Sequence, residues 1–222
     1  MSGPRIGVIH ATPLSMAPIT EAMETEFPDA DVRHVLDDSL LNDLRAAGEL
    51  TEDLERRMER VIEHLLADDI DALQFACSGY VPVVDRAASR LDIPIRKPDE
   101  AMYRELAETG HGHVGILATV QPALDLAAQQ LQQLLDARSA STVITTRCVT
   151  EAMDAAQLGD DDELTRMLTA AVNHLSGSGV VVVAFAQYSM SPVAETVAEL
   201  TGVPIVTGPR AAARDLKQAL GA

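Results

Sequence analysis

The chain has 222 residues, of which 47% are hydrophobic and 3% aromatic, and its formal net charge at pH 7 is −17. This length suits two similar halves of about 100 residues each, with a core built from Ala, Val, Leu and Ile. The acidic balance and the lack of any Lys/Arg cluster exclude a nucleic-acid-binding face and disfavour binding to anionic membranes.

Short β-rich segments alternate with helical segments along the whole chain. Several of the β-rich segments are continuous apolar runs (IGVI, VGIL, VVVVAF), which are typical of strands buried on both faces of a parallel sheet. The predicted strands are residues 5–9, 31–35, 72–75, 113–117, 142–147, 180–185 and 204–206. Helical spacing of apolar residues marks segments 51–67, 123–135 and 161–175. The pattern predicts an α/β fold with two doubly wound parallel sheets.

The sequence repeats itself at an offset of about 110 residues. Residues 75–95 read FACSGYVPVVDRAASRLDIPI, and residues 185–205 read FAQYSMSPVAETVAELTGVPI. Both begin where a predicted strand meets a helix, and the alignment places Cys77 of the first copy on Gln187 of the second. A weaker repeat relates IGVIHATPLSM to VGILATVQPAL. We therefore expect two pseudo-symmetric halves that differ at one chemically important position.

The first half is predicted to comprise residues 1–98 and 207–222, and the second half residues 99–206. In open α/β sheets, ligands bind beyond the carboxyl ends of the strands. Two halves that face each other at these ends would enclose one active site. The chain has no apolar run approaching the roughly 20 residues of a membrane span. Its first residues lack the features of a secretory signal, so a cytoplasmic protein is expected.

Cys77 is the main candidate for chemistry. It follows a buried apolar strand and precedes Ser78 and Gly79 at the start of a helix, where the helix dipole and free N–H groups favour a thiolate. The same N–H groups can bind a substrate carboxylate. The alternative interpretation is a small buried hydrophobe. Cys148 has no counterpart in the repeat, and a structural role is predicted for it. No closely spaced Cys/His cluster is found, so no metal site is expected.

Three further residues lie at predicted strand ends. The hydroxyl groups of Thr12 and Thr119 either bind a carboxylate together with backbone N–H groups or cap the helices that follow. His10 is either a base or a core histidine with satisfied hydrogen bonds. Lys97 and Arg210 follow the two copies of the repeat and are placed near the rim of the expected site.

The motifs CSGY, IGVIHATP and GILAT resemble those of the aspartate/glutamate/hydantoin racemase superfamily, in the same order and at similar spacing over nearly the whole chain. The resemblance implies two pseudo-symmetric α/β halves, an active site between them, no cofactor and a homodimer. It also implies a second catalytic cysteine, which this chain lacks from residue 185 to 190. Gln187 stands there, and an amide donates or accepts hydrogen bonds but cannot take the α-proton.

The resemblance predicts an enzyme that acts at the α-carbon of a small carboxylate, such as an amino acid, by racemisation or isomerisation. The alternatives are a one-thiol decarboxylase, lyase or cis-trans isomerase of the same superfamily, or a non-catalytic protein that binds small carboxylates. Tyr188 or His10 is the candidate for the missing second acid–base group. The predicted catalytic residues are Cys77, Gln187 and Tyr188, and the predicted substrate-binding residues are His10, Thr12, Ser78, Gly79, Thr119 and Ser189.

Overall fold

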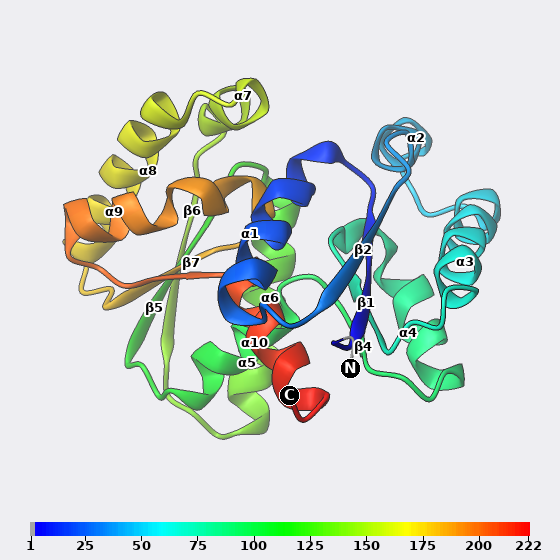
Figure 1. The fold of residues 1–222 in the computed structure, drawn as a ribbon. Helices are drawn as coiled ribbons and strands as arrows, with labels where there is room; N and C mark the ends of the chain where they lie inside the picture. Colours follow the sequence, from blue (N-terminus) through cyan, green and yellow to red (C-terminus); the bar gives the residue numbers. More distant parts are fainter. Residues whose placement is uncertain (1–2) are drawn as a thin grey trace. The chain divides into compact units, whose positions relative to one another are not determined.

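The protein is described from a computed structural model, which covers residues 3–222, and the chain divides into two compact units (Figure 1). Unit 1 comprises the chain up to Pro98 together with Ala212–Ala222, and unit 2 comprises Asp99–Ala211. The sequence assigns residues 207–222 to the first half. In the structure, residues 207–211 belong to unit 2. The last helix, α10 (Gly208–Ala219), therefore begins in unit 2 and ends in unit 1.

Unit 1 is built on a four-stranded parallel sheet, sheet A, with strand order β2-β1-β3-β4. Its strands are β1 (Arg5–His10), β2 (Asp31–Leu36), β3 (Ala72–Phe75) and β4 (Ile95–Arg96). Helices cover both faces, with α3 and α4 on one side and α1 on the other (Figure 1). The helices of this unit are α1 (Met16–Glu26), α2 (Leu40–Ala47), α3 (Glu52–Leu66) and α4 (Val81–Arg90), with short 3-10 helices η1 (Pro13–Ser15) and η2 (Ser78–Tyr80).

Unit 2 repeats this arrangement in sheet B, whose strand order is β6-β5-β7-β8 and whose strands are also parallel. Its strands are β5 (His113–Ala118), β6 (Val143–Cys148), β7 (Val182–Phe185) and β8 (Ile205–Thr207). Its helices are α5 (Glu100–Glu108), α6 (Gln121–Ala137), α7 (Ala152–Leu158), α8 (Asp161–Ser176) and α9 (Ala194–Thr201), with the 3-10 helix η3 (Tyr188–Val193). The prediction of two doubly wound parallel sheets is confirmed.

The strand predictions differ from the structure mainly at their ends. Segment 180–185 was predicted as one strand, but the strand begins at Val182, because Val180 and Val181 connect it to the preceding helix. Val181 is 51% exposed, so the apolar run VVVVAF is not buried throughout. Strand β4 was not predicted. It pairs with β3 through Ile95 and Arg96 only, and two residues are too few to show a period in sequence.

Alternating side chains of sheet B enter two different cores. Leu117, Val183 and Phe185 pack under α7, α8 and α9, whereas Ile116 and Ala184 pack under α5 and α6. This alternation follows from the two-residue period of a strand. Continuous apolar runs are therefore required in β5 and β7, which is why their sequences lack the polar–apolar alternation of a half-exposed strand.

Two glycines at matching places in the two units let a helix approach the sheet closely. A Cβ atom added at Gly7 in β1 would lie 2.7 Å from Leu73 Cδ2 and 3.1 Å from Leu65 Cδ1 of α3. The counterpart at Gly115 in β5 would lie 3.0 Å from Leu175 Cδ1 of α8. Each glycine therefore makes room for a leucine near the end of the helix that packs on its sheet, and the repeat extends to the packing of the cores.

Candidate active site

The Cys77 loop lies at the carboxyl end of β3, where α/β sheets bind ligands. Cys77 has an extended backbone and forms the N-cap of η2, and α4 follows directly with Pro82 in its first turn. Its side chain is half-buried, and the backbone N–H of Gly79 forms a hydrogen bond to the thiol. Ser78, the next predicted binding residue, is exposed.

The pKa of the Cys77 thiol is raised, because burial outweighs the hydrogen bond from Gly79 and the positive charge of Arg45. The sequence predicted the opposite shift from the nearby helix N-terminus, and this prediction is wrong. The donors are present, but the free-energy cost of desolvating the thiolate exceeds the stabilisation that they provide. Sequence reasoning also missed Arg45, whose guanidinium on α2 is the cation that acts on this thiol. It lies 32 residues from Cys77, and no local motif points to it.

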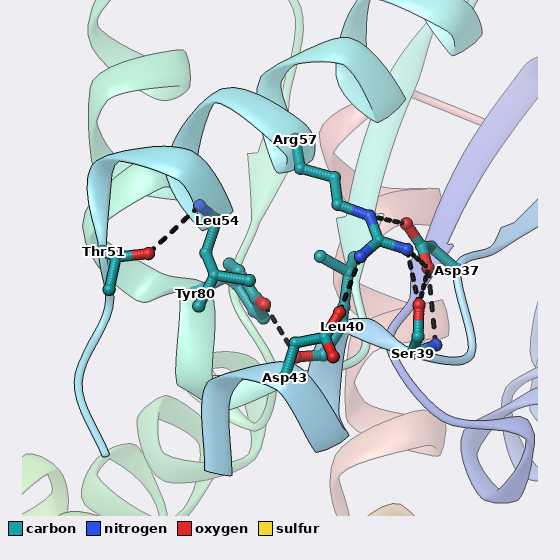
Figure 2. Close-up of polar contacts among 8 residues, drawn as sticks. All are labelled: Asp37, Ser39, Leu40, Asp43, Thr51, Leu54, Arg57 and Tyr80. Atoms are coloured by element: carbon teal, nitrogen blue, oxygen red, sulfur yellow. Dashed lines mark hydrogen bonds and ion pairs between the residues drawn. The ribbon is translucent and has the colours of Figure 1, made fainter. Parts of the chain in front are cut away.

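Helix α2 covers the Cys77 loop. A Cβ atom at Gly79 would overlap the Cδ2 of Leu44 on α2 and would lie 3.8 Å from Cys77 Sγ. Of the side chains in α2, only Leu40 is fully buried. The Tyr80 hydroxyl donates to the Leu40 carbonyl over 2.9 Å, which joins the start of α2 to the end of the Cys77 loop (Figure 2).

Arg57 of α3 fixes the segment that leads into α2. Its guanidinium donates to both carboxylate oxygens of Asp37 over 2.5 Å, to the Ser39 hydroxyl over 2.5 Å and to Asp43 over 2.7 Å (Figure 2). Charge-assisted bonds of this bidentate kind are stronger and more directional than neutral ones. Arg57 therefore holds the start of α2, together with the burial of Leu40 and the hydrogen bond from Tyr80.

Thr12 lies at the carboxyl end of β1, the strand next to β3. Its backbone is extended and its Oγ1 accepts from the Leu14 N–H over 3.5 Å, so it acts as a weak N-cap of η1. Its carbonyl accepts from the Ser15 hydroxyl over 3.0 Å. The side chain is half-exposed. The cap is therefore present, and binding of a carboxylate by Thr12 stays a prediction.

His10 is fully buried and both of its ring nitrogens have partners. Nδ1 lies 2.7 Å from the Ser15 hydroxyl, and Nε2 lies 2.9 Å from Nδ1 of His34. His34 in turn contacts the Thr20 hydroxyl at 3.1 Å. Burial and the neighbouring His34 lower the pKa of His10 to about 4. His10 is thus neutral near pH 7 and contacts the β1–η1 turn through Ser15, and its role in substrate binding stays a prediction.

Gln187 takes the place of Cys77 in unit 2. It follows β7, forms the N-cap of η3, and has φ −153° and ψ 137°, against −143° and 121° at Cys77. Its Oε1 accepts from the backbone N–H of Thr119 and from the Thr119 hydroxyl, the latter over 2.9 Å. Two predicted site residues are therefore brought together, at the carboxyl ends of β5 and β7. Neither of them titrates near neutral pH.

Tyr188 and Ser189 follow Gln187 in η3, where Tyr188 is buried and Ser189 half-buried. Burial and the nearby Asp99 raise the pKa of Tyr188 well above 10. Its hydroxyl therefore stays protonated at physiological pH and is a poor candidate for a base. Asp99 itself was not predicted. It is a buried acid beside Tyr188, and its only sequence feature is its place just after the first copy of the repeat, in the segment KPDE.

The remaining predicted polar residues form surface ion pairs. Lys97 lies 2.8 Å from Asp85, and Arg210 lies 2.7 Å from Glu195. The thiol of Cys148 is half-buried on the edge strand β6, and burial raises its pKa. Within residues 3–222, no group of three His, Cys, Asp or Glu side chains is arranged to hold a metal ion. Over the same part of the chain, the helices are too short or too polar to span a membrane.

Comparison with known proteins identifies the family. The family model of Asp/Glu/hydantoin racemase matches residues 6–216. Among solved structures, the aspartate racemase of Picrophilus torridus is 16% identical, with 99% of this chain and 95% of that chain covered and a TM-score of 0.71. The glutamate racemase isoform RacE1 of Bacillus anthracis is 17% identical, with 100% and 83% covered and a TM-score of 0.72.

A mutant of arylmalonate decarboxylase also shares the fold, with 14% identity, 98% and 94% of the two chains covered and a TM-score of 0.57. No curated protein matches the sequence. The structural neighbours are too distant in sequence to show more than the fold, whereas the family model covers nearly the whole chain. The repeat, the two parallel sheets and the match over residues 6–216 together show that this chain belongs to the Asp/Glu/hydantoin racemase family.

Proposed function

We propose that the protein is a cofactor-independent racemase or isomerase that acts at the α-carbon of a small carboxylate, with Cys77 as the proton-transfer group of unit 1. The observation that carries this proposal is the place of the thiol. Cys77 stands at the carboxyl end of a central strand, on a loop whose Gly79 N–H already donates to its sulfur, near the guanidinium of Arg45. Family membership supplies the reaction class.

The chain's own groups suit each requirement of this chemistry. Loss of the α-proton creates an enolate-like anion, which needs hydrogen-bond donors and positive charge at its carboxylate oxygens. Arg45 and the N–H groups at the start of η2 provide these in unit 1. The same cation would pair with a bound carboxylate and with the thiolate. The candidate donors to the substrate carboxylate are Thr12, Ser78, Gly79, Thr119 and Ser189.

The raised pKa of Cys77 fits a thiol that stays protonated, and therefore weakly reactive, until its surroundings change. A general base works best when its pKa is near the operating pH. Leu44 of α2 lies over the loop, and either access of water to the sulfur or a closer approach of the Arg45 guanidinium would lower the pKa. We infer that the ligand-free state holds the thiol protonated and protects it from oxidation.

A one-thiol decarboxylase is the second candidate, and the observation that favours it is Gln187 in the position equivalent to Cys77. Loss of CO₂ would generate the carbanion without a base, and Cys77 would then only have to protonate it. Gln187 and Thr119 would bind the departing or the remaining carboxylate. The structural similarity to arylmalonate decarboxylase is consistent with this reading, although it shows the fold alone.

Proton NMR in D₂O tests the proposal. The protein would be incubated with amino acids, hydroxy acids, malonates, maleate and hydantoins, and loss of the α-proton signal, loss of CO₂ and change of optical rotation would be followed. Cys77→Ala should abolish turnover, whereas Cys148→Ala, a matched half-buried thiol in unit 2, should leave it unchanged. Turnover that survives Cys77→Ala would refute the assignment. Binding without any turnover, equally tight in both forms, would identify a non-catalytic carboxylate-binding protein.

A further inference from the structure

Strand register shows which residue stands next to the strand–helix corner of each unit. In sheet A, Ile9 of β1 pairs with Phe75 of β3, so the same register places Ala11 opposite Cys77 two residues further on. Ala11 is fully buried and has no polar side-chain atom. The neighbouring strand therefore offers the thiol of unit 1 no side-chain partner at this level.

Unit 2 differs from unit 1 at both of these positions. In sheet B, Leu117 of β5 pairs with Phe185 of β7, and the register places Thr119 opposite Gln187. A threonine thus replaces the alanine where an amide replaces the thiol, and the threonine forms two hydrogen bonds with that amide. The paired difference indicates that Thr119 and Gln187 act together as one group.

The contacts of Thr119 fix which end of the Gln187 amide faces outward. A backbone N–H can only donate, so the side-chain atom that accepts from the Thr119 N–H is Oε1, and the Thr119 hydroxyl donates to the same oxygen over 2.9 Å. Gln187 is half-buried, and among the residues that the structure describes none bonds to its Nε2. The exposed Gln121 and Gln132 are held the other way round, since their Nε2 atoms donate to carboxylates one turn away.

The free end of Gln187 can therefore donate hydrogen bonds but not accept them, and it lies at the carboxyl edge of a parallel sheet, where ligands bind. A carboxylate only accepts, and its bonds are stronger than those of a neutral acceptor. We propose that Nε2 of Gln187 binds a carboxylate group of the substrate, and that Thr119 is a positioning residue that turns the amide outward rather than a contact of the substrate. This inference rests on the proposed function, which supplies the substrate class.

The inference makes carboxylate binding in unit 2 depend on one atom. Gln187→Glu keeps the shape of the side chain, and one of its oxygens can still accept both hydrogen bonds from Thr119. The outward atom becomes a charged oxygen, which repels a carboxylate instead of donating to it. Loss of binding in this variant would therefore follow from the exchange of the NH₂ group alone. Gln187→Met, which has similar length and no donor, is the second variant if the glutamate disturbs folding.

NMR of side-chain amides tests the inference directly. The 15N-labelled protein would be titrated with malonate, aspartate and hydantoin at constant ionic strength, and the NH₂ signals of Gln187 identified by their absence in Gln187→Glu. Malonate and aspartate should shift these signals saturably, whereas hydantoin, a neutral acceptor, should not. The dissociation constant of malonate should rise about 10- to 100-fold in Gln187→Glu, the size expected for a hydrogen bond to a charged group. An equal shift with hydantoin would overturn the assignment to a carboxylate.

Two variants of Thr119 test its positioning role. Thr119→Ser keeps both donors and should bind malonate as the wild type does. Thr119→Val keeps only the N–H and should bind more weakly, and equal affinity in this variant would overturn the role given to Thr119. Gln132 is the matched control, because its Nε2 is already bonded to Asp136; its signals should stay in place, and Gln132→Glu should bind malonate normally.

The titration needs no turnover, so its result is independent of the reaction. Saturable shifts at Gln187 in a protein that shows no Cys77-dependent exchange of α-protons would support this inference and refute the proposed function alone. Exchange that depends on Cys77, without any shift at Gln187, would overturn this inference and leave the proposed function intact. Undiminished affinity for malonate in both folded Gln187 variants would also overturn it.

Discussion

Replacement of Asp99 by asparagine should make the protein more stable at high pH and should leave it little changed at low pH. A carboxyl group whose pKa is higher in the folded than in the unfolded state keeps its proton in the folded state while the unfolded chain has lost it. Between the two pKa values the folded state binds more protons, so stability falls as pH rises. Asparagine has a similar shape and does not titrate. The unfolding free energy of the variant therefore does not fall in this way as pH rises.

The magnitude follows from the two pKa values. The shift from 3.8 to about 7 spans about 3 units, which corresponds to about 4 kcal/mol lost between these pH values and not regained above them. About 3 kcal/mol of this falls between pH 5 and pH 8, where urea unfolding is practicable. The opposite shift of His10, whose pKa is lowered to about 4, makes stability rise over part of the same range. The wild-type profile should therefore be nearly flat, while that of Asp99→Asn climbs with pH.

Urea unfolding of the wild type, Asp99→Asn and Asp69→Asn at half-unit steps from pH 5 to pH 8 measures this. The difference in unfolding free energy between Asp99→Asn and wild type cancels the contribution of His10, and it should grow by about 3 kcal/mol across the range. Asp69→Asn, at an exposed residue that shares the left-handed backbone of Asp99, is the control for the substitution itself. Parallel profiles for Asp99→Asn and wild type would show that the carboxyl group is ionised and has a partner in the folded protein, and the reasoning about its burial would then be wrong.

Further predictions concern Gly115, Arg57 and His10. Gly115→Ala should cost about 1–3 kcal/mol of unfolding free energy, because its Cβ would meet Leu175 and Val180 at 3.0 and 2.9 Å, whereas Gly112→Ala, which has open space, should change little in the same urea experiment. Arg57→Gln should raise the rate of alkylation of Cys77 by iodoacetamide, since α2 loses its ionic anchor; an unchanged rate would contradict the role of α2 as a cover. His10→Gln should remove about 3 kcal/mol of acid destabilisation between pH 6.5 and 4, because the neutral form of His10 is favoured in the folded state and stability is lost as pH falls through this window; a wild-type-like acid limb in the variant would refute this.

The sequence predicted the architecture well and the electrostatics poorly, for a physical reason. Apolar runs and the repeat are local signals, and they were enough for seven of the strands and for the equivalence of Cys77 and Gln187, whose backbone angles agree. Strand β4 was missed because its two residues carry no period. Helix α2 was not predicted either, because its eight residues are too few to show a clear helical period.

The candidate site depends on contacts between distant residues, and these have no local signal. Arg45 acts on Cys77 from another element, and Asp99 owes its raised pKa to burial by segments near residues 188 and 208. The thiolate predicted from the helix N-terminus was wrong for the same reason, because a sequence shows the donors but not the desolvation. The roles of Thr12, Ser78, Gly79, Thr119 and Ser189 in binding stay predictions.

The weak attachment of α2 has a consequence for how Cys77 is reached. A segment with one fully buried side chain, two partly buried leucines, one hydrogen bond from Tyr80 and an ionic anchor belongs to the part of a protein that opens at a free-energy cost below that of global unfolding. Local opening of α2 would expose the sulfur to water and remove the desolvation that raises its pKa. The amide protons of α2 should therefore exchange with solvent early. The rate at which Cys77 reacts should follow the same opening equilibrium. Thiol reactivity then depends on the stability of a helix and not on the cysteine alone.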